Sequence, residues 1–233
     1  MGSELRIVIN YNSPPCQNTN EESMNPTFKQ FIENIVCQKA PGPTTMFTVA
    51  HVFFALELMS EKAIGRNKLA KKLEVGEGTV RTIINRLRKA GLIVTSKEGC
   101  RLTRQGFAIW KKFEELFPKR VEIGETELTN AENNYAILVK DMGNKVKSGI
   151  EQRDAAIVAG ANRAVIMVSR GGHLIIESVS NSLEQQFPSV MEKILSILQP
   201  EENGVIVLVG ATTLWKAKQG AFAASWTLIE SDE

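Results

Sequence analysis

Apolar residues recur at helical spacing through the first half of the chain. Spacings of three and four predict four successive helices, at residues 25–40, 48–62, 67–73 and 79–90. The segment 48–62 is apolar almost all round, which predicts a buried central helix.

Two short strands and a further helix follow these four segments. Residues 92–95 and 100–102 predict a hairpin around a turn at 97–99, and Thr103 is a typical N-cap for a helix that carries Phe107, Trp110, Phe113 and Phe117. Glycines at 76 and 78 predict a tight turn at Gly76-Glu77-Gly78 between the third and fourth helices. The order of elements is that of a winged helix-turn-helix.

The pattern changes after residue 119. Alternation and helical period predict the order β-α-β-β-α-β plus a terminal helix, at 135–139, 149–158, 164–169, 173–179, 188–198, 204–209 and 212–229. The first six elements match the ferredoxin-like arrangement. The predicted fold class is therefore α+β, with an N-terminal winged helix-turn-helix domain and a C-terminal α/β domain.

Four segments follow from these patterns. They are a flexible polar tail at 1–24, a winged helix-turn-helix DNA-binding domain at 25–118, a linker at 119–131, and an α/β dimerisation or effector-sensing domain at 132–233.

Charge is distributed unevenly along the chain. The whole chain has a formal net charge of +2, but residues 45–120 contain 16 Lys and Arg against 7 Asp and Glu. The remainder carries a net negative charge. Such a basic segment favours a polyanion as its partner. A solvated basic face is the alternative.

The predicted fourth helix buries its apolar face and leaves a basic face exposed. Thr79, Arg81, Thr82 and Asn85 lie towards its start, where recognition helices reach base edges. Residues further along are expected to bind the DNA backbone, and the turn of the hairpin is expected to reach an adjacent phosphate or the minor groove. The full candidate DNA-binding set is Thr79, Arg81, Thr82, Asn85, Arg86, Arg88, Lys89, Lys97, Arg101 and Lys68.

The predicted C-terminal helix has two apolar stripes. Leu214, Ala217 and Ala221 belong to one, and Trp215 and Phe222 belong to the other. Two such faces imply two packing partners, which we interpret as the sheet and a second subunit in a homodimer. A small-molecule effector is a further candidate partner of this domain.

Arg153 and Asp154 form the most chemically distinctive pair in the C-terminal half. They could hold a zwitterionic ligand, or they could form an ion pair at the surface or between subunits. His51, on an apolar helix, is expected to be a core histidine.

Several classes of protein are excluded or disfavoured. Cys16, Cys37 and Cys100 are far apart, so neither a metal cluster nor a disulfide framework is expected. No apolar run approaches a membrane span and no signal peptide is evident, which favours the cytoplasm. Phosphate-binding loops and catalytic constellations are absent from the sequence, so we expect no cofactor and no enzymatic activity.

A family resemblance rests on specific segments: Ile64-Gly65-Arg66, Leu69-Ala70, Val75-Gly76-Glu77-Gly78-Thr79-Val80-Arg81-Thr82, Gly91-Leu92-Ile93, and Leu102-Thr103 with Gly106. Together they resemble an archaeal family of winged helix-turn-helix transcriptional regulators with an uncharacterised C-terminal domain. The resemblance covers about residues 45–230. It implies the domain layout and an archaeal source, and it implies little about mechanism.

These observations together predict a dimeric, sequence-specific DNA-binding transcriptional regulator. Its recognition helix is 79–90, and its C-terminal domain serves dimerisation and is a candidate for small-molecule sensing. Two alternatives stay open: a winged-helix module that binds proteins, and an enzyme fused to a winged helix.

Overall fold

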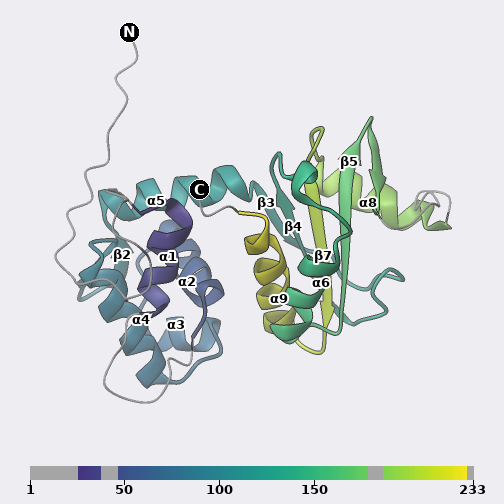
Figure 1. Cartoon of the computed structure of the whole chain (residues 1–233). Coiled ribbons are helices and arrows are strands. Elements are labelled where there is room, and N and C mark those ends of the chain that lie inside the picture. The colour runs from purple at the N-terminus through teal and green to yellow at the C-terminus, as the bar shows by residue number, and fades with distance from the viewer. Residues whose placement is uncertain (1–25, 38–46, 178–185, 230–233) are drawn as a thin grey trace, which may run out of the picture.

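The computed structural model describes residues 26–37, 47–177 and 186–229, so the predicted tail at 1–24 lies outside it. Helices dominate the N-terminal part, and a five-stranded sheet flanked by helices forms the C-terminal part (Figure 1). The predicted α+β class with two unlike parts is therefore confirmed.

The N-terminal part has the predicted order of elements. It comprises α1 (Phe28–Cys37), α2 (Val49–Glu61), α3 (Arg66–Lys72), α4 (Glu77–Lys89), β1 (Ile93–Ser96), β2 (Gly99–Leu102) and α5 (Arg104–Leu116). Helix α2 is central, as its all-round apolar pattern predicts, and it buries eight of its 13 residues. Thr103 caps α5 because its hydroxyl accepts a hydrogen bond from the Gly106 amide at 3.0 Å. This arrangement is a winged helix-turn-helix.

The C-terminal part is built on one sheet. Its elements are β3 (Lys119–Glu122), β4 (Asn133–Val139), η1 (Gly143–Lys145), α6 (Ile150–Val158), β5 (Arg163–Arg170), β6 (His173–Ile175), α8 (Pro188–Leu198), β7 (Val205–Ala211) and α9 (Leu214–Thr227). The strand order is β3-β4-β7-β5-β6, and every neighbouring pair is antiparallel.

This strand order differs from the predicted ferredoxin-like arrangement. The last strand, β7, lies between β4 and β5 in the middle of the sheet, whereas the ferredoxin-like arrangement places it at an edge. Helices also cover both faces, with α6 and α9 on one and α8 on the other. The reason lies in β7, where all seven residues are buried, so both of its faces need a covering layer.

The predicted linker is partly a strand. Lys119–Glu122 form β3, which pairs with β4 and begins three residues after α5 ends. Arg120 also binds back to the N-terminal part, since its Nε donates to Glu57 Oε1 at 2.8 Å and its guanidinium lies over the Trp110 ring. The polar sequence of this segment suits an edge strand. No flexible connection separates the two parts at this point.

Helix α9 has two apolar faces, as predicted, but its second partner is not another subunit. One face packs on β4 and β7, and the other packs on α2, where the rings of Phe222 and Phe53 stack at 4.5 Å between centroids. Figure 1 shows α9 between the N-terminal helices and the sheet. The expected dimer contact through α9 is therefore wrong, because the chain's own N-terminal part covers that face.

Candidate nucleic-acid interface

Helix α4 presents the predicted division between a buried and an exposed face. Val80, Ile83 and Leu87 are fully buried against the rest of the N-terminal part. On the opposite side four side chains are exposed to solvent, namely Arg81, Asn85, Arg88 and Lys89. The helix therefore offers three cations and an amide on one accessible surface, which suits phosphates and base edges.

The two threonines of the predicted set are only half-buried. Thr79 lies in the first turn of α4, and Thr82 donates from its hydroxyl to the Gly78 carbonyl at 3.1 Å. Asn85 accepts a weak hydrogen bond from Arg88 Nη2 at 3.4 Å, which orients both side chains along the exposed face. All four of these residues keep atoms at the surface.

Arg86 does not belong to this surface, contrary to the prediction. It is 5 % exposed, and its guanidinium donates to the main-chain carbonyls of Ile35, at 3.0 Å, and Val36. The same group lies 5.1 Å from the centre of the Phe47 ring. Burial lowers the pKa of Arg86 from its usual value. Arg86 therefore fastens α4 to the C-terminal end of α1 and is unavailable to DNA.

The turn before α4 lies earlier than predicted. Glu74 adopts a positive φ of 50°, while Gly76 has an ordinary φ of −66° and serves as the N-cap. A Cβ added at Gly76 or Gly78 would meet no atom within 4 Å. The two glycines are thus not required by the turn, and they lie on either side of Glu77, whose side chain is exposed.

The hairpin β1–β2 forms the wing. Lys97 is exposed in its turn, and Arg101 is exposed on β2 opposite Val94 of β1. Gly99, at the start of β2 beside the turn, allows the wing to lie against the chain before α3, because an added Cβ there would lie 2.5 Å from the Ile64 carbonyl carbon. Two hydrogen bonds between Ile64 and Cys100 fix this contact.

Helix α3 adds further exposed cations beside the wing. Lys68 is exposed as predicted, and so is Arg66, which the sequence-based set omitted. Arg66 is close enough to Cys100 of the wing to lower the pKa of its thiol, although burial raises that pKa by more. The structure therefore extends the basic surface to Arg66. Its position at the start of α3, next to the wing, is visible only once the chain is folded.

The candidate residues outside the winged helix have simpler surroundings. Arg153 and Asp154 pair with each other at 2.9 Å, and both side chains are more than half exposed. His51 is buried, which lowers its pKa to about 4, and its Nδ1 accepts from the Thr48 amide at 3.0 Å. Within the described ranges, no three His, Cys, Asp or Glu side chains form a group that could hold a metal ion.

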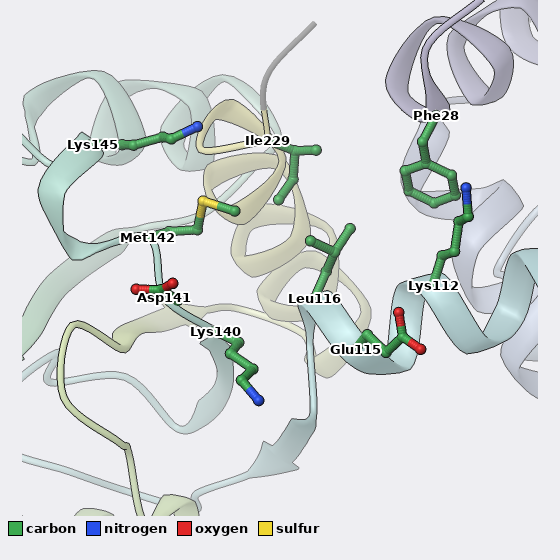
Figure 2. A pocket seen from close by; sticks show the side chains of 9 residues that line it. All are labelled: Phe28, Lys112, Glu115, Leu116, Lys140, Asp141, Met142, Lys145 and Ile229. Atoms are coloured by element: carbon green, nitrogen blue, oxygen red, sulfur yellow. The ribbon is translucent and has the colours of Figure 1, made fainter. Parts of the chain in front are cut away.

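A cavity of about 520 Å³ lies where the two parts of the chain meet. Figure 2 shows apolar side chains of both parts around it, with three lysines and two carboxylates nearby. Asp141 is already engaged, since its Oδ1 accepts from Asn203 Nδ2 at 2.5 Å. The lining residues are Phe28, Lys112, Glu115, Leu116, Lys140, Asp141, Met142, Lys145 and Ile229.

The N-terminal part is a winged helix-turn-helix with exposed cations on α4 and beside its wing. These features are typical of DNA-binding proteins. Two family models match the chain. Residues 53–117 match the CggR N-terminal DNA binding domain, and residues 130–228 match a domain of unknown function, DUF4443. The chain thus combines a DNA-binding domain with an uncharacterised one, as predicted.

The chain is also similar to a solved structure. A hypothetical protein from Pyrococcus horikoshii OT3 shares 28% sequence identity with it, and the two superpose with a TM-score of 0.64 over 78% of this chain and 92% of that one. No curated protein matches the chain. Among the described residues, no helix is both long and apolar enough to cross a membrane.

Proposed function

We propose that this chain is a dimeric, sequence-specific transcriptional regulator that acts on DNA in the cytoplasm and has no enzymatic activity. The observation that carries the proposal is the exposed row on α4, made of Arg81, Asn85, Arg88 and Lys89, within a domain that matches a DNA-binding family. The archaeal source of the similar solved structure agrees with the resemblance to archaeal regulators.

The exposed residues divide into two roles. Arg81 lies in the second turn of α4 and Asn85 in the third, and they read base edges in the major groove because the N-terminal end of a recognition helix lies deepest. Arg88 and Lys89 lie in its last turn and bind phosphates. Lys97 and Arg101 of the wing and Lys68 of α3 contact the flanking backbone. Thr79 and Thr82 lie beside these residues and keep atoms at the surface, whereas Arg86 is buried and has no part in this arrangement.

The proposal is tested by fluorescence anisotropy with the duplex upstream of the chain's own gene, over a salt series. We expect sub-micromolar binding whose logarithm falls linearly with the logarithm of salt concentration. Arg81→Ala should lose about 1–3 kcal/mol and relax the preference for this duplex over a random one. The matched control is Arg163→Ala, which removes an exposed arginine from β5 and should leave binding unchanged.

Two outcomes of these binding measurements would contradict the proposal. If neither the specific nor the random duplex binds at low salt, the basic surface serves a protein partner and the regulator proposal fails. If Arg163→Ala weakens binding as much as Arg81→Ala does, DNA binding is diffuse electrostatic attraction and α4 is not the recognition helix.

We place effector sensing in the cavity between the two parts of the chain. Its apolar lining of Phe28, Leu116, Met142 and Ile229 suits an apolar body, and its three lysines against two carboxylates favour a negatively charged group. A ligand there contacts both the DNA-binding part and the sheet-containing part, so it could favour one relative placement of the two.

A thermal-shift screen of small carboxylates and phosphates tests this part. A true effector should raise the melting temperature of the wild type and change its affinity for DNA, and Lys112→Ala should reduce both effects. Ligands that stabilise Lys112→Ala as much as the wild type bind elsewhere and would rule out this cavity.

A further inference from the structure

Apolar side chains remain exposed on the helix α6, outside the surfaces described so far. Five large hydrophobic side chains are exposed among the described residues, and three of them, Ile150, Ile157 and Val158, belong to α6. Val158 is 89 % exposed. Nothing in the chain's own described residues covers this face, and α9, the predicted dimer contact, is already covered on both sides.

The outward face of α6 is a single stripe. Gln152 and Ala156 are buried on the inner face, towards α9 and β5. On the outer face lie Ile150, Arg153, Asp154 and Ile157, all of them exposed and spaced at i, i+3, i+4 and i+7. The stripe is therefore apolar at both ends and carries one positive and one negative charge at its centre.

This stripe is complementary to itself in one orientation. If two α6 helices lie antiparallel across a twofold axis between residues 153 and 154, Ile150 of each faces Ile157 of the other. The same axis places Arg153 of each copy opposite Asp154 of the other. A parallel pair would instead face like charges, so the pattern selects the antiparallel arrangement.

We propose that α6 is the dimer contact of this protein, with a second copy of the chain as its partner. Within one chain Arg153 and Asp154 pair with each other at the surface, where solvent makes such an ion pair weak. Across the axis the pair is repeated twice and is flanked by two Ile150–Ile157 contacts. The exposed Val158 extends the apolar seam at each end. The proposal rests on the proposed function in that it supplies the dimer needed to bind two half-sites.

Charge reversal tests the pairing directly by sedimentation equilibrium of the full chain without DNA. The wild type should dimerise. Arg153→Asp leaves only negative charges at the axis, and Asp154→Arg leaves only positive charges there. Each variant alone should therefore dimerise at least about tenfold more weakly than the wild type. The two variants mixed should associate with each other at wild-type strength, and so should the double reversal with itself.

The matched control is Arg163→Asp, which reverses an exposed charge away from the seam and should leave the dimerisation constant unchanged. A wild type that is monomeric at high micromolar concentration, or mixed variants that fail to associate, would overturn the proposal. Circular dichroism of each variant shows whether the fold is intact, since the four residues are exposed.

Failure here is distinguishable from failure of the proposed function. Arg153→Asp should still bind a duplex that carries a single half-site with wild-type affinity, because the winged helix is untouched. Loss of dimerisation with retained half-site binding supports both proposals. A dimer that involves α6 but binds no DNA would uphold the contact and overturn the regulator.

Discussion

Arg86 shows how a single residue can be misassigned from its sequence alone. It follows Asn85 on a basic helix, and helical spacing does not place it clearly on the buried or the exposed side of α4. The fold decides the matter, since the carbonyls of Ile35 and Val36 at the C-terminal end of α1 lie within reach of its guanidinium and accept its hydrogen bonds. The signal that could have identified this structural role of Arg86 is the C-terminal end of α1, which lies about 50 residues earlier in the chain.

Arg86 and Arg88 should respond in opposite ways to the same substitution. Arg86→Met should lower the free energy of unfolding by about 1–3 kcal/mol, because the carbonyls of Ile35 and Val36 lose the hydrogen bonds from its guanidinium. Where the variant is folded, its affinity for DNA should be close to that of the wild type. Urea denaturation and anisotropy provide the two measurements.

Arg88→Met is the matched control, two residues further along the same helix. Its side chain is exposed, so stability should change by no more than about 0.5 kcal/mol. Its affinity for DNA should fall, and the slope of the logarithm of the binding constant against the logarithm of salt concentration should decrease in magnitude by about one. If instead Arg86→Met abolishes DNA binding at unchanged stability, our assignment of Arg86 to the fold is wrong.

At the level of elements, the sequence predicts most of the N-terminal part because local signals determine it. Helical period, the Thr103 cap and the wing turn each act within a few residues, and the structure shows the helices and the hairpin they predict. The turn before α4 is misplaced by a few residues, since its glycines predict a turn whose positive φ falls on Glu74.

The C-terminal part is predicted less completely, because its arrangement depends on distant contacts. The order of strands and helices from β4 onward is predicted correctly, whereas β3 falls in the predicted linker. Strand order across the sheet follows from pairing that no local pattern encodes. Both apolar faces of α9 are visible in the sequence. The pattern shows that two partners exist but not that one of them, α2, belongs to the same chain.

At the scale of the whole molecule, the larger of two apolar core clusters includes residues of both parts of the chain, while the smaller lies between the sheet and α8. Phe53 of α2 packs against Phe113 and Phe117 of the N-terminal part and also against Phe222 of α9. Such aromatic pairs are each worth about 0.5–1.5 kcal/mol beyond the area they bury. A strand that begins three residues after α5 adds a covalent connection with little freedom.

We therefore expect the chain to unfold in one transition. Calorimetry of the wild type should show a single peak, and tryptophan fluorescence and far-ultraviolet circular dichroism should give the same midpoint. Phe222→Ala should lower the stability of the whole molecule by about 3–5 kcal/mol, because it opens the core between the two parts. Two separate transitions, of which Phe222→Ala shifts only one, would show that the parts fold independently.

The anchoring of α4 on α1 has a mechanical consequence. Phe28 at the start of α1 lines the cavity, while the carbonyls near the end of α1 hold Arg86 of the recognition helix. Ten residues of helix span about 15 Å, and a helix transmits displacement along its axis with little compression. A shift of Phe28 by a bound molecule would thus be transmitted to α4 and its exposed basic face through α1, a helix outside the helix-turn-helix itself.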